Sequence, residues 1–149
     1  MQARAKGEPL ALAFCDVYHF KQINDRYGHP AGDTVLRVVA DRIKGQLRSS
    51  DLAVRYGGEE FVVFLVQATE CDAFGVAERI RRGIADAPYL VLGDQRLSLT
   101  VSGGIAQLQP VQGQVDPAAL GPAMLQQADA ALYRAKSAGR NRVARHSRA

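Results

Sequence analysis

The chain has 149 residues, of which 47% are hydrophobic and 23% charged. This composition supplies apolar material for one globular domain over residues 1–149 and does not suggest disorder. No apolar run approaches the roughly 20 residues of a membrane-spanning helix and no signal peptide is recognisable, so we expect a cytoplasmic domain without membrane contact. The net charge of +4 favours anionic partners, and Cys15 and Cys71 form neither a metal-binding spacing nor a disulfide framework.

The first predicted elements are a buried strand and two helices. Residues 10–17 are a short, continuous apolar run, which is typical of a central strand buried on both faces. Residues 20–27 have room for a short helix or turn, and a longer helix is expected from about residue 31 to residue 47. The longer helix is indicated by one apolar stripe of Val35, Leu36, Val39, Ile43 and Leu47.

A glycine pair follows between two strand-like runs. Residues 52–54 and 61–66 flank Gly57-Gly58, which predicts a two-residue hairpin turn because glycine accepts the positive φ of such turns. The absence of side chains would also let a ligand approach the backbone closely. Glu59 and Glu60 come next, and strand alternation predicts that they point to opposite faces of the sheet. A charged hairpin tip without further function is the simpler interpretation of this stretch by itself.

The second half of the chain predicts two more helices and further strands. A helix is expected over about residues 71–85, with Phe74, Ala77, Ile80 and Ile84 facing inward. Residues 89–92 and 97–108 are strand-like, and residues 141–143 could add a short edge strand. The last helix is indicated by Met124, Leu125, Ala128, Leu132 and Ala135, with Gly139 at its C-terminus. We therefore expect an α/β (α+β) sandwich in which helices flank a central, mostly antiparallel sheet of about five strands.

Two acidic residues lie where predicted strands meet loops. If the strands that carry Asp16 and Glu59 are neighbours, two hard oxygen ligands converge on one site. Two carboxylates with open positions for phosphate oxygens suit Mg²⁺ or Mn²⁺ and do not suit zinc. Such a metal neutralises a triphosphate and activates an attacking hydroxyl. The spacing alone leaves a purely structural role for both residues open.

Five segments in one order resemble the motifs of the GGDEF family, the diguanylate cyclase domains. The hairpin stretch is similar to the family signature in its GGEEF form. The five segments are Asp16-Val17 with residues 20–25, residues 27–29 with Gly32-Asp33, residues 57–61, residues 128–136 and residues 139–141.

The resemblance implies a nucleotidyl-cyclase-like, ferredoxin-like core and the condensation of two GTP into cyclic di-GMP with release of two pyrophosphates. One such domain holds one GTP, so turnover would require two copies facing each other in a homodimer. Asp16 and Glu59 would be the catalytic residues and, with the Val17 carbonyl, would hold Mg²⁺ or Mn²⁺ over the triphosphate. No nucleic acid is expected as a partner.

The resemblance also implies contacts to the base and to the phosphates. Asn24 and Asp33 would read the guanine edge, whose N1–H and N2–H₂ donors a carboxylate accepts. A turn role for Asn24 and a helix-dipole role for Asp33 are the structural alternatives. The other implied contacts come from the backbone around His19, Phe20 and Lys21, and from His29, Gly57, Gly58, Lys136 and Arg140. Without the resemblance, the last two would be ordinary cations near a helix C-terminus.

A second site is implied by an R-x-x-D motif. Arg48 and Asp51 stand ahead of the Gly-Gly pair, where the family has its product-inhibition site. Arginine grips phosphate and guanine edges with two parallel donors, and Asp51 can accept from guanine. Arg79, in the following helix, resembles the auxiliary arginine of that inhibitory site.

The chain departs from the family pattern in two respects. Tyr18 stands where the family usually has a second Asp, and the upstream D-x-L-T-G-L-x-N-R segment has no counterpart. The second departure indicates the C-terminal fragment of a longer multidomain protein. The alternative function is a non-catalytic module that binds GTP or cyclic di-GMP, which Tyr18 favours and which Asp16 and Glu59 oppose.

Overall fold

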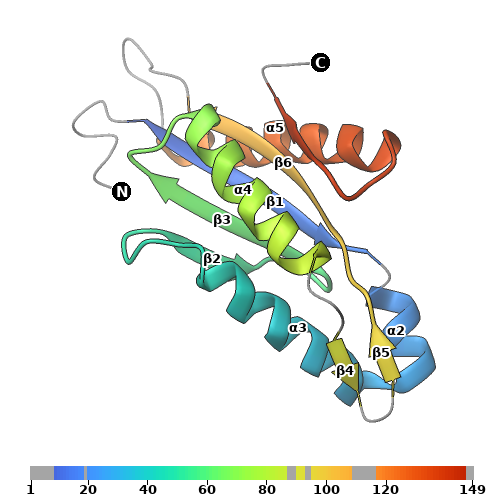
Figure 1. Cartoon of the computed structure of the whole chain (residues 1–149). Coiled ribbons are helices and arrows are strands. Elements are labelled where there is room, and N and C mark those ends of the chain that lie inside the picture. The colour runs from blue at the N-terminus through green and yellow to red at the C-terminus, as the bar shows by residue number, and fades with distance from the viewer. Residues whose placement is uncertain (1–8, 19, 87–89, 93–94, 109–116, 147–149) are drawn as a thin grey trace.

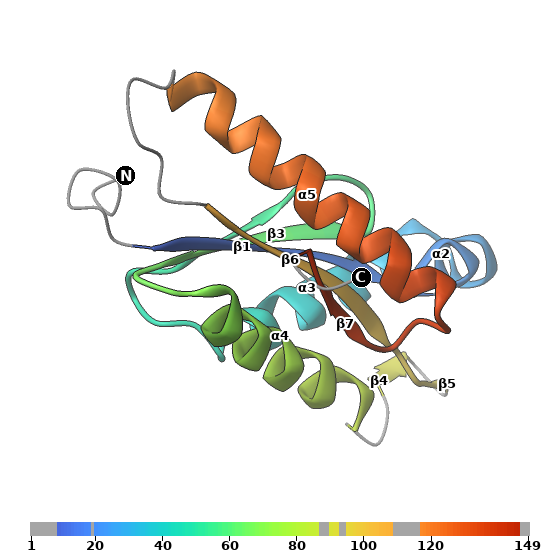
Figure 2. The same cartoon turned by 90° about the horizontal axis from the view of Figure 1, so that it is seen from above.

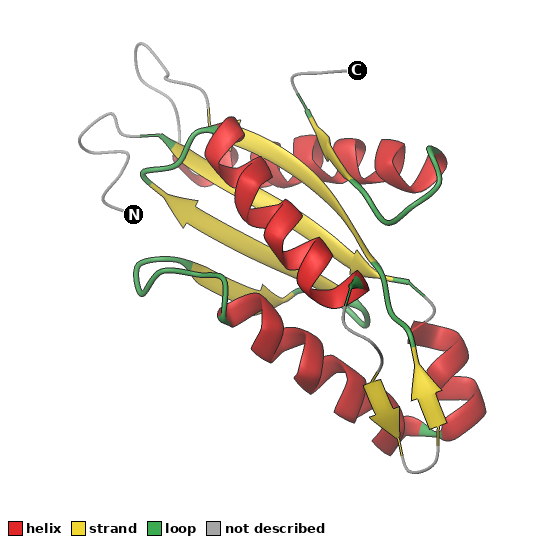
Figure 3. Cartoon of the chain, viewed as in Figure 1, coloured by secondary structure: helices red, strands yellow, loops and turns green. Residues whose placement is uncertain are grey.

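The computed structural model describes residues 9–18, 20–86, 90–92, 95–108 and 117–146. Within these ranges a five-stranded sheet forms the centre of the molecule, with the strand order β2-β3-β1-β6-β7. All neighbouring strands are antiparallel except β6 and β7, which are parallel. The predicted α/β fold with a mostly antiparallel sheet is confirmed (Figures 1 and 3). Its strands are β1 (Leu10–Val17), β2 (Leu52–Arg55), β3 (Glu60–Val66), β6 (Val101–Leu108) and β7 (Val143–Arg145).

Helices cover both faces of the sheet. Figure 2 shows α5 on one face and α3 and α4 on the other. A separate two-stranded ribbon consists of β4 and β5 (Figure 1). The bounds are α2 (Phe20–Tyr27), α3 (His29–Lys44), α4 (Glu70–Ala85), α5 (Pro117–Ser137), β4 (Leu90–Leu92) and β5 (Gln95–Leu97).

The strand β1 is central because its side chains are apolar on both faces. Its eight residues are all buried. Alternation sends Ala11, Ala13 and Cys15 into the core beneath α3 and α4, while Leu12 and Phe14 pack into the core beneath α5. The even-numbered positions of β1 therefore lead along the α5 face to Asp16.

The helix α5 approaches the sheet closely at one glycine. A Cβ atom on Gly104 of β6 would lie 2.1 Å from the carbonyl oxygen of Ala128 and 2.3 Å from the backbone nitrogen of Leu132. Only glycine allows this approach without a shift of backbone. The contact therefore fixes the position of α5 on the sheet, and with it the Lys136 side chain near its end.

The predicted elements differ from the structure mainly at their ends. The helix expected from residue 31 begins at His29 and ends at Lys44, while its predicted apolar stripe is buried as far as Ile43. The helix α4 begins at Glu70 because Thr69 and Asp72 cap it reciprocally, at 3.2 and 3.0 Å.

Three of the expected details are wrong. Phe74 is only half-buried, and the residue before it, Ala73, is buried instead. The single strand expected over residues 97–108 is divided, since Leu97 belongs to β5 and β6 starts at Val101. The edge strand expected at residues 141–143 is displaced to Val143–Arg145, and residue 89 lies outside the described residues.

Among the described residues, no helix is long and apolar enough to cross a membrane.

Candidate active site

The candidate site lies at the carboxyl end of β1, where it meets the start of β3 and the end of α5. Asp16 is 8% exposed, and Lys136 of α5 donates to its Oδ2 atom. The backbone N–H of Val17 donates to the carbonyl of Glu59 at 3.1 Å, which holds the hairpin loop against the end of β1. These four residues line one pocket of about 230 Å³. The structure therefore brings together the three expected metal-binding residues and one expected phosphate contact.

The pKa of Glu59 is raised by its surroundings in this site. Burial raises the pKa of Glu59 above its ordinary range, and the charge of Asp16 raises it further, while Lys136 and Lys21 oppose the shift. A divalent cation would relieve this repulsion. Among the described residues, no group of three or more His, Cys, Asp or Glu side chains could hold a metal by itself. The donor set fits a Mg²⁺-like cation that takes further oxygens from phosphate or water.

Glu60 adds a carboxylate that the sequence did not assign to the site. It pairs with Asp16 in the β1–β3 register, so the two residues lie side by side on the α5 face. Burial and the charge of Asp16 raise the pKa of Glu60 as well, with Lys136 opposing. Ser102, the partner of Asp16 on β6, is also buried in this pocket. Strand register is the signal that identifies both residues, and it is not readable from spacing alone.

Further cations and an aromatic ring also line this pocket. Lys21 and Phe20 come from the start of α2, and Arg140 comes from the turn after α5. The guanidinium of Arg140 lies over the Tyr18 ring at 4.8 Å from the ring centroid, a cation–π contact. Tyr18 therefore supports a predicted phosphate contact. His19, expected to contribute backbone to the phosphates, lies outside the described residues.

A strained turn presents Arg140 to the pocket. Gly139, Arg140 and Asn141 have φ values of 127°, 62° and 48°, so three successive residues are in the left-handed region. The backbone N–H of Asn141 donates to the buried Ser102 hydroxyl at 3.1 Å, and Arg81 of α4 donates to the Asn141 side chain at 3.0 Å. These bonds hold the turn against the sheet and α4.

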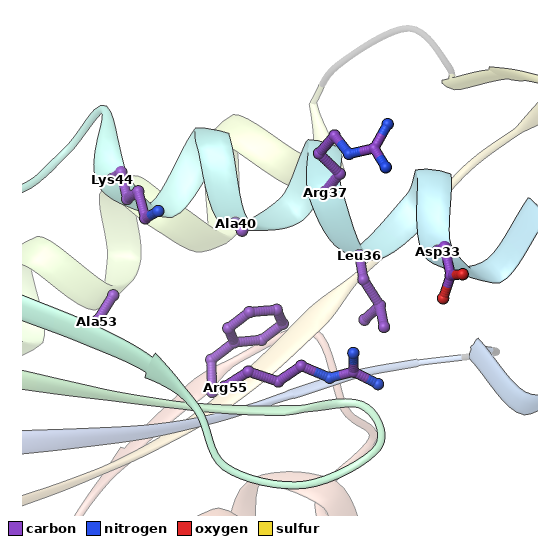
Figure 4. Close-up of a pocket in the computed structure, with 8 residues that line it drawn as sticks. Asp33, Leu36, Arg37, Ala40, Lys44, Ala53 and Arg55 are labelled. Carbon is purple, nitrogen blue, oxygen red and sulfur yellow. The ribbon is translucent and has the colours of Figure 1, made fainter. Parts of the chain in front are cut away.

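The residues expected to read guanine lie on neighbouring helices. Asn24 of α2 is hydrogen-bonded through Nδ2 to Nδ1 of His29 at 3.0 Å. A Cβ on Gly32 would lie 2.3 Å from Asn24 Oδ1, so glycine at this position admits the amide between α2 and α3. Asp33 lines a second cavity of about 380 Å³ between α3 and the β2–β3 hairpin (Figure 4). Leu36 is among the apolar residues of this cavity.

The hairpin loop differs from the expected two-residue turn. Tyr56 N–H donates to the Glu60 carbonyl at 2.8 Å, so residues 57–59 form the loop. Neither glycine of the loop has a positive φ, in contrast to the prediction. A Cβ on Gly58 would meet nothing within 4 Å, whereas one on Gly57 would lie 3.0 Å from Glu60 Oε1. The loop is therefore open to solvent at Gly58, which is the backbone access that the sequence predicted.

A comparison with protein families shows to which family the chain belongs. The model of the diguanylate cyclase GGDEF domain matches residues 1–142. The chain belongs to the GGDEF family. Glu59, the last residue of the hairpin loop, lines the pocket that holds Asp16.

Curated relatives of this GGDEF domain include cyclases and a response regulator. It is 44% identical over 138 residues to the diguanylate cyclase DgcP of Pseudomonas aeruginosa, covering 92% of this chain and 19% of the relative. It is 40% identical over 143 residues to the response regulator PleD of Caulobacter vibrioides, covering 95% and 30%. The chain therefore spans between a fifth and a third of the length of these relatives.

Solved structures share the fold closely. The GGDEF domain of DgcB from Caulobacter crescentus, in complex with c-di-GMP, has a TM-score of 0.84 at 34% identity, covering 98% of this chain and 82% of that one. The active GGEEF domain of a diguanylate cyclase from Vibrio cholerae has a TM-score of 0.84 at 32% identity, covering 99% and 89%.

A third cavity of this GGDEF domain contains the R-x-x-D motif. Arg48, Asp51 and Arg79 line a cavity of about 500 Å³ between the α3–β2 loop and α4. Arg48 donates to both carboxylate oxygens of Asp51, at 2.9 and 3.1 Å, and to the Val66 carbonyl at 2.6 Å. The Asp51 side chain is 2% exposed and that of Arg48 is 54% exposed. Asp51 thus holds an arginine whose outer side faces solvent.

Hydrogen bonding determines the protonation of Asp51. Burial raises its pKa, but the hydrogen bonds from the Arg48 side chain and backbone outweigh burial and place the pKa below the ordinary range. The carboxylate is therefore ionised at neutral pH, and it keeps Arg48 in place.

Proposed function

We propose that this GGDEF domain is a diguanylate cyclase that condenses two GTP into cyclic di-GMP and releases two pyrophosphates. The observation that carries the proposal is the convergence of Asp16 and Glu59 in a pocket that Lys21 and Arg140 also line. Carboxylates for a cation and cations for phosphates in one pocket match the charges of a metal–triphosphate complex. The similarity to DgcP, a diguanylate cyclase by name, supports the same reaction. A domain that consumes GTP works in the cytoplasm.

The chain's own residues provide the metal-binding and phosphate-binding groups. The carboxylates of Asp16 and Glu59 and the Val17 carbonyl would hold Mg²⁺ or Mn²⁺, which supplies charge neutralisation at the phosphates when bound. Lys136 leaves its pairing with Asp16 and turns to the phosphates, for which its partly exposed position leaves room. Arg140, held on Tyr18, and Lys21 would contact the outer phosphates in the same pocket.

Base recognition is the role we assign to Asn24 and Asp33. A carboxylate accepts from the N1–H and N2–H₂ groups of guanine, a pair of donors that adenine does not present together. Asp33 faces a cavity with an apolar side at Leu36, which suits the flat base. His29 orients the Asn24 amide through their hydrogen bond.

Turnover is a property of two domains. Each pocket takes one GTP, so the 3′-hydroxyl of one nucleotide must reach the α-phosphate of the other across a homodimer. The open side of the loop at Gly58 supports this arrangement, because a second domain's nucleotide can approach there without meeting a side chain.

Product inhibition is the role we assign to the R-x-x-D cavity. Arg48 and Arg79 would bind the phosphates and guanine edges of cyclic di-GMP, with the buried Asp51 orienting Arg48. The DgcB structure, described as a complex with c-di-GMP, supports a product-binding role for the family fold.

A non-catalytic binding module is the second candidate function. Tyr18 favours it, because a phenol stands in the pocket where the family usually has a carboxylate. The two functions differ in a product assay. We expect the dimerised domain with Mg²⁺ and GTP to form cyclic di-GMP and two equivalents of pyrophosphate. Tight GTP binding without either product would establish the module instead.

A further inference from the structure

The loop that carries Glu59 is held by a side chain to which the proposed function gives no role. Arg55 is the last residue of β2, and its Nε donates to the Gly57 carbonyl at 3.2 Å. Its Nη2 atom donates to the Gly58 carbonyl at 2.9 Å. Glu59 follows directly, and its own carbonyl accepts from Val17 at 3.1 Å. Three successive carbonyls of the loop are therefore fixed, two by Arg55 and one by β1.

The chemistry of the loop explains why an arginine is needed. The loop has two glycines, so it has few side-chain contacts of its own, and a Cβ on Gly58 would meet nothing. A guanidinium presents several donors in one rigid plane, which matches two neighbouring carbonyls. A lysine ammonium has no such fixed pair of donors. Loss of Arg55 therefore frees the carbonyls that precede Glu59 while leaving β2 paired with β3.

Arg55 also reaches the cavity of the candidate base site. It lines the 380 Å³ cavity together with Asp33 and Leu36. Figure 4 shows the Arg55 side chain extending below Leu36 toward the end of the cavity where Asp33 lies. One side chain thus borders the cavity of the base and holds the loop of the metal-binding carboxylate.

We propose that Arg55 is a positioning residue that fixes the hairpin loop so that the Glu59 carboxylate faces Asp16. It couples the base cavity on the α3 side of the hairpin to the metal-binding pocket at the end of β1. This inference rests on the proposed function, because it assigns the metal to Asp16 and Glu59. A residue that only stabilised the hairpin would lower the stability of the fold without a specific effect on the metal.

The test measures affinity for a non-hydrolysable GTP analogue by calorimetry, with and without Mg²⁺, on the full chain. We expect Arg55→Ala to reduce the Mg²⁺-dependent gain in affinity about tenfold, because two hydrogen bonds to the loop are lost. Affinity without Mg²⁺ should stay within about twofold. Arg55→Lys should behave like Arg55→Ala, since it keeps the charge and loses the paired donors.

Two controls separate positioning from charge and from stability. Arg37→Ala removes a cation from the same cavity, and Figure 4 shows that side chain pointing away from the hairpin. It should keep the full Mg²⁺-dependent gain. In a Glu59→Gln background, Arg55→Ala should add no further loss, because the residue through which it acts is already disabled.

Three outcomes would overturn the inference. They are an equal loss with and without Mg²⁺, an equal effect of Arg37→Ala, and an additive loss in the Glu59→Gln background. Each would show that Arg55 does not act through Glu59. Failure of the proposed function is distinguishable, because the unaltered chain would then bind the analogue without any gain from Mg²⁺.

Discussion

At the scale of single residues, Asp16 is the position around which the candidate site is built. Its strand places it beside Glu60, the loop places Glu59 next to it, and Lys136 neutralises it from α5. Carboxylates held this close repel one another, so they reduce the stability of the fold while they prepare the site for a cation. The pKa directions and a set of substitutions follow from this arrangement.

The raised pKa of Glu59 predicts the pH dependence of metal binding. Metal binding needs the carboxylate, so the Mg²⁺-dependent gain in nucleotide affinity should be lost, as pH falls, at a higher pH than for an ordinary glutamate. Affinity measured from pH 4 to pH 8 checks this. If the Mg²⁺-dependent gain were lost only at the pH of an ordinary glutamate, the pKa of Glu59 would not be raised by burial and by the charge of Asp16.

The raised pKa of Glu59 also affects the stability of the fold, and here a lower pH is favourable. A carboxyl whose pKa is raised on folding favours the folded state below its unfolded pKa, and this advantage is lost as pH rises through the folded pKa. Glu59→Gln should therefore unfold at an equal or higher temperature than the unaltered chain at pH 7, without added metal. Thermal unfolding at pH 4 and pH 7 tests this, and a lower melting temperature at pH 7 would show that Glu59 is stabilising.

Substitutions of Tyr18 test whether its ring holds Arg140 in place through the cation–π contact. Tyr18→Phe keeps the aromatic ring and should leave GTP affinity within about twofold, whereas Tyr18→Leu should weaken it about threefold to fivefold. Tyr18→Asp restores the family residue and should lower the Mg²⁺ needed for activity. Titrations with GTP and with GMP check the assignment. Equal losses for both nucleotides would mean that Tyr18 does not act through a contact to the outer phosphates.

At the scale of elements, Gly104 of β6 fixes the position of the helix that carries Lys136. Gly104→Ala should destabilise the fold by about 2 kcal/mol or more, because its Cβ would meet backbone at 2.1 Å. Gly103→Ala is the matched control, since its Cβ would meet Val143 only at 3.6 Å, and it should cost less than about 1 kcal/mol. Denaturant unfolding of both variants checks the difference. Equal stability would place α5 farther from the sheet.

The position of the Arg48–Asp51 pair predicts separate binding sites for substrate and product. Arg48→Ala should abolish high-affinity binding of cyclic di-GMP and leave GTP turnover available, because its cavity is distinct from the Asp16 pocket. Calorimetry with cyclic di-GMP and a product assay without added cyclic di-GMP check the two halves. Wild-type affinity in the variant would exclude a product site at this cavity.

Apolar patterns predicted the elements better than their ends and contacts. The run at residues 10–17 and the stripe along α3 gave correct elements, because burial follows the periods of strand and helix. Glu60 beside Asp16 and Arg55 on the loop carbonyls depend on strand register and on loop geometry, which spacing does not reveal. The inward position of Phe74 was wrong, since the neighbouring Ala73 is buried and Phe74 is only half-buried, which the spacing of apolar residues did not distinguish.

At the scale of the whole molecule, the described residues form one pocket that contains both expected catalytic carboxylates. If turnover needs two facing domains, specific activity should rise with protein concentration, and fusion to an N-terminal coiled coil should raise it further. An assay across a hundredfold range of concentration, paired with the measured mass in solution, checks this. Constant specific activity from a proven monomer would exclude the facing homodimer.

The measurement that tests the central claim most directly is cyclic di-GMP synthesis by the coiled-coil-fused domain and its Glu59→Gln variant, at saturating Mg²⁺ and GTP. We expect product from the unaltered domain and a loss of about 100-fold or more in the variant, whose unfolding temperature is not lowered. Equal synthesis by the two proteins would remove Glu59 from the site and contradict the assignment of Asp16 and Glu59 as its catalytic carboxylates.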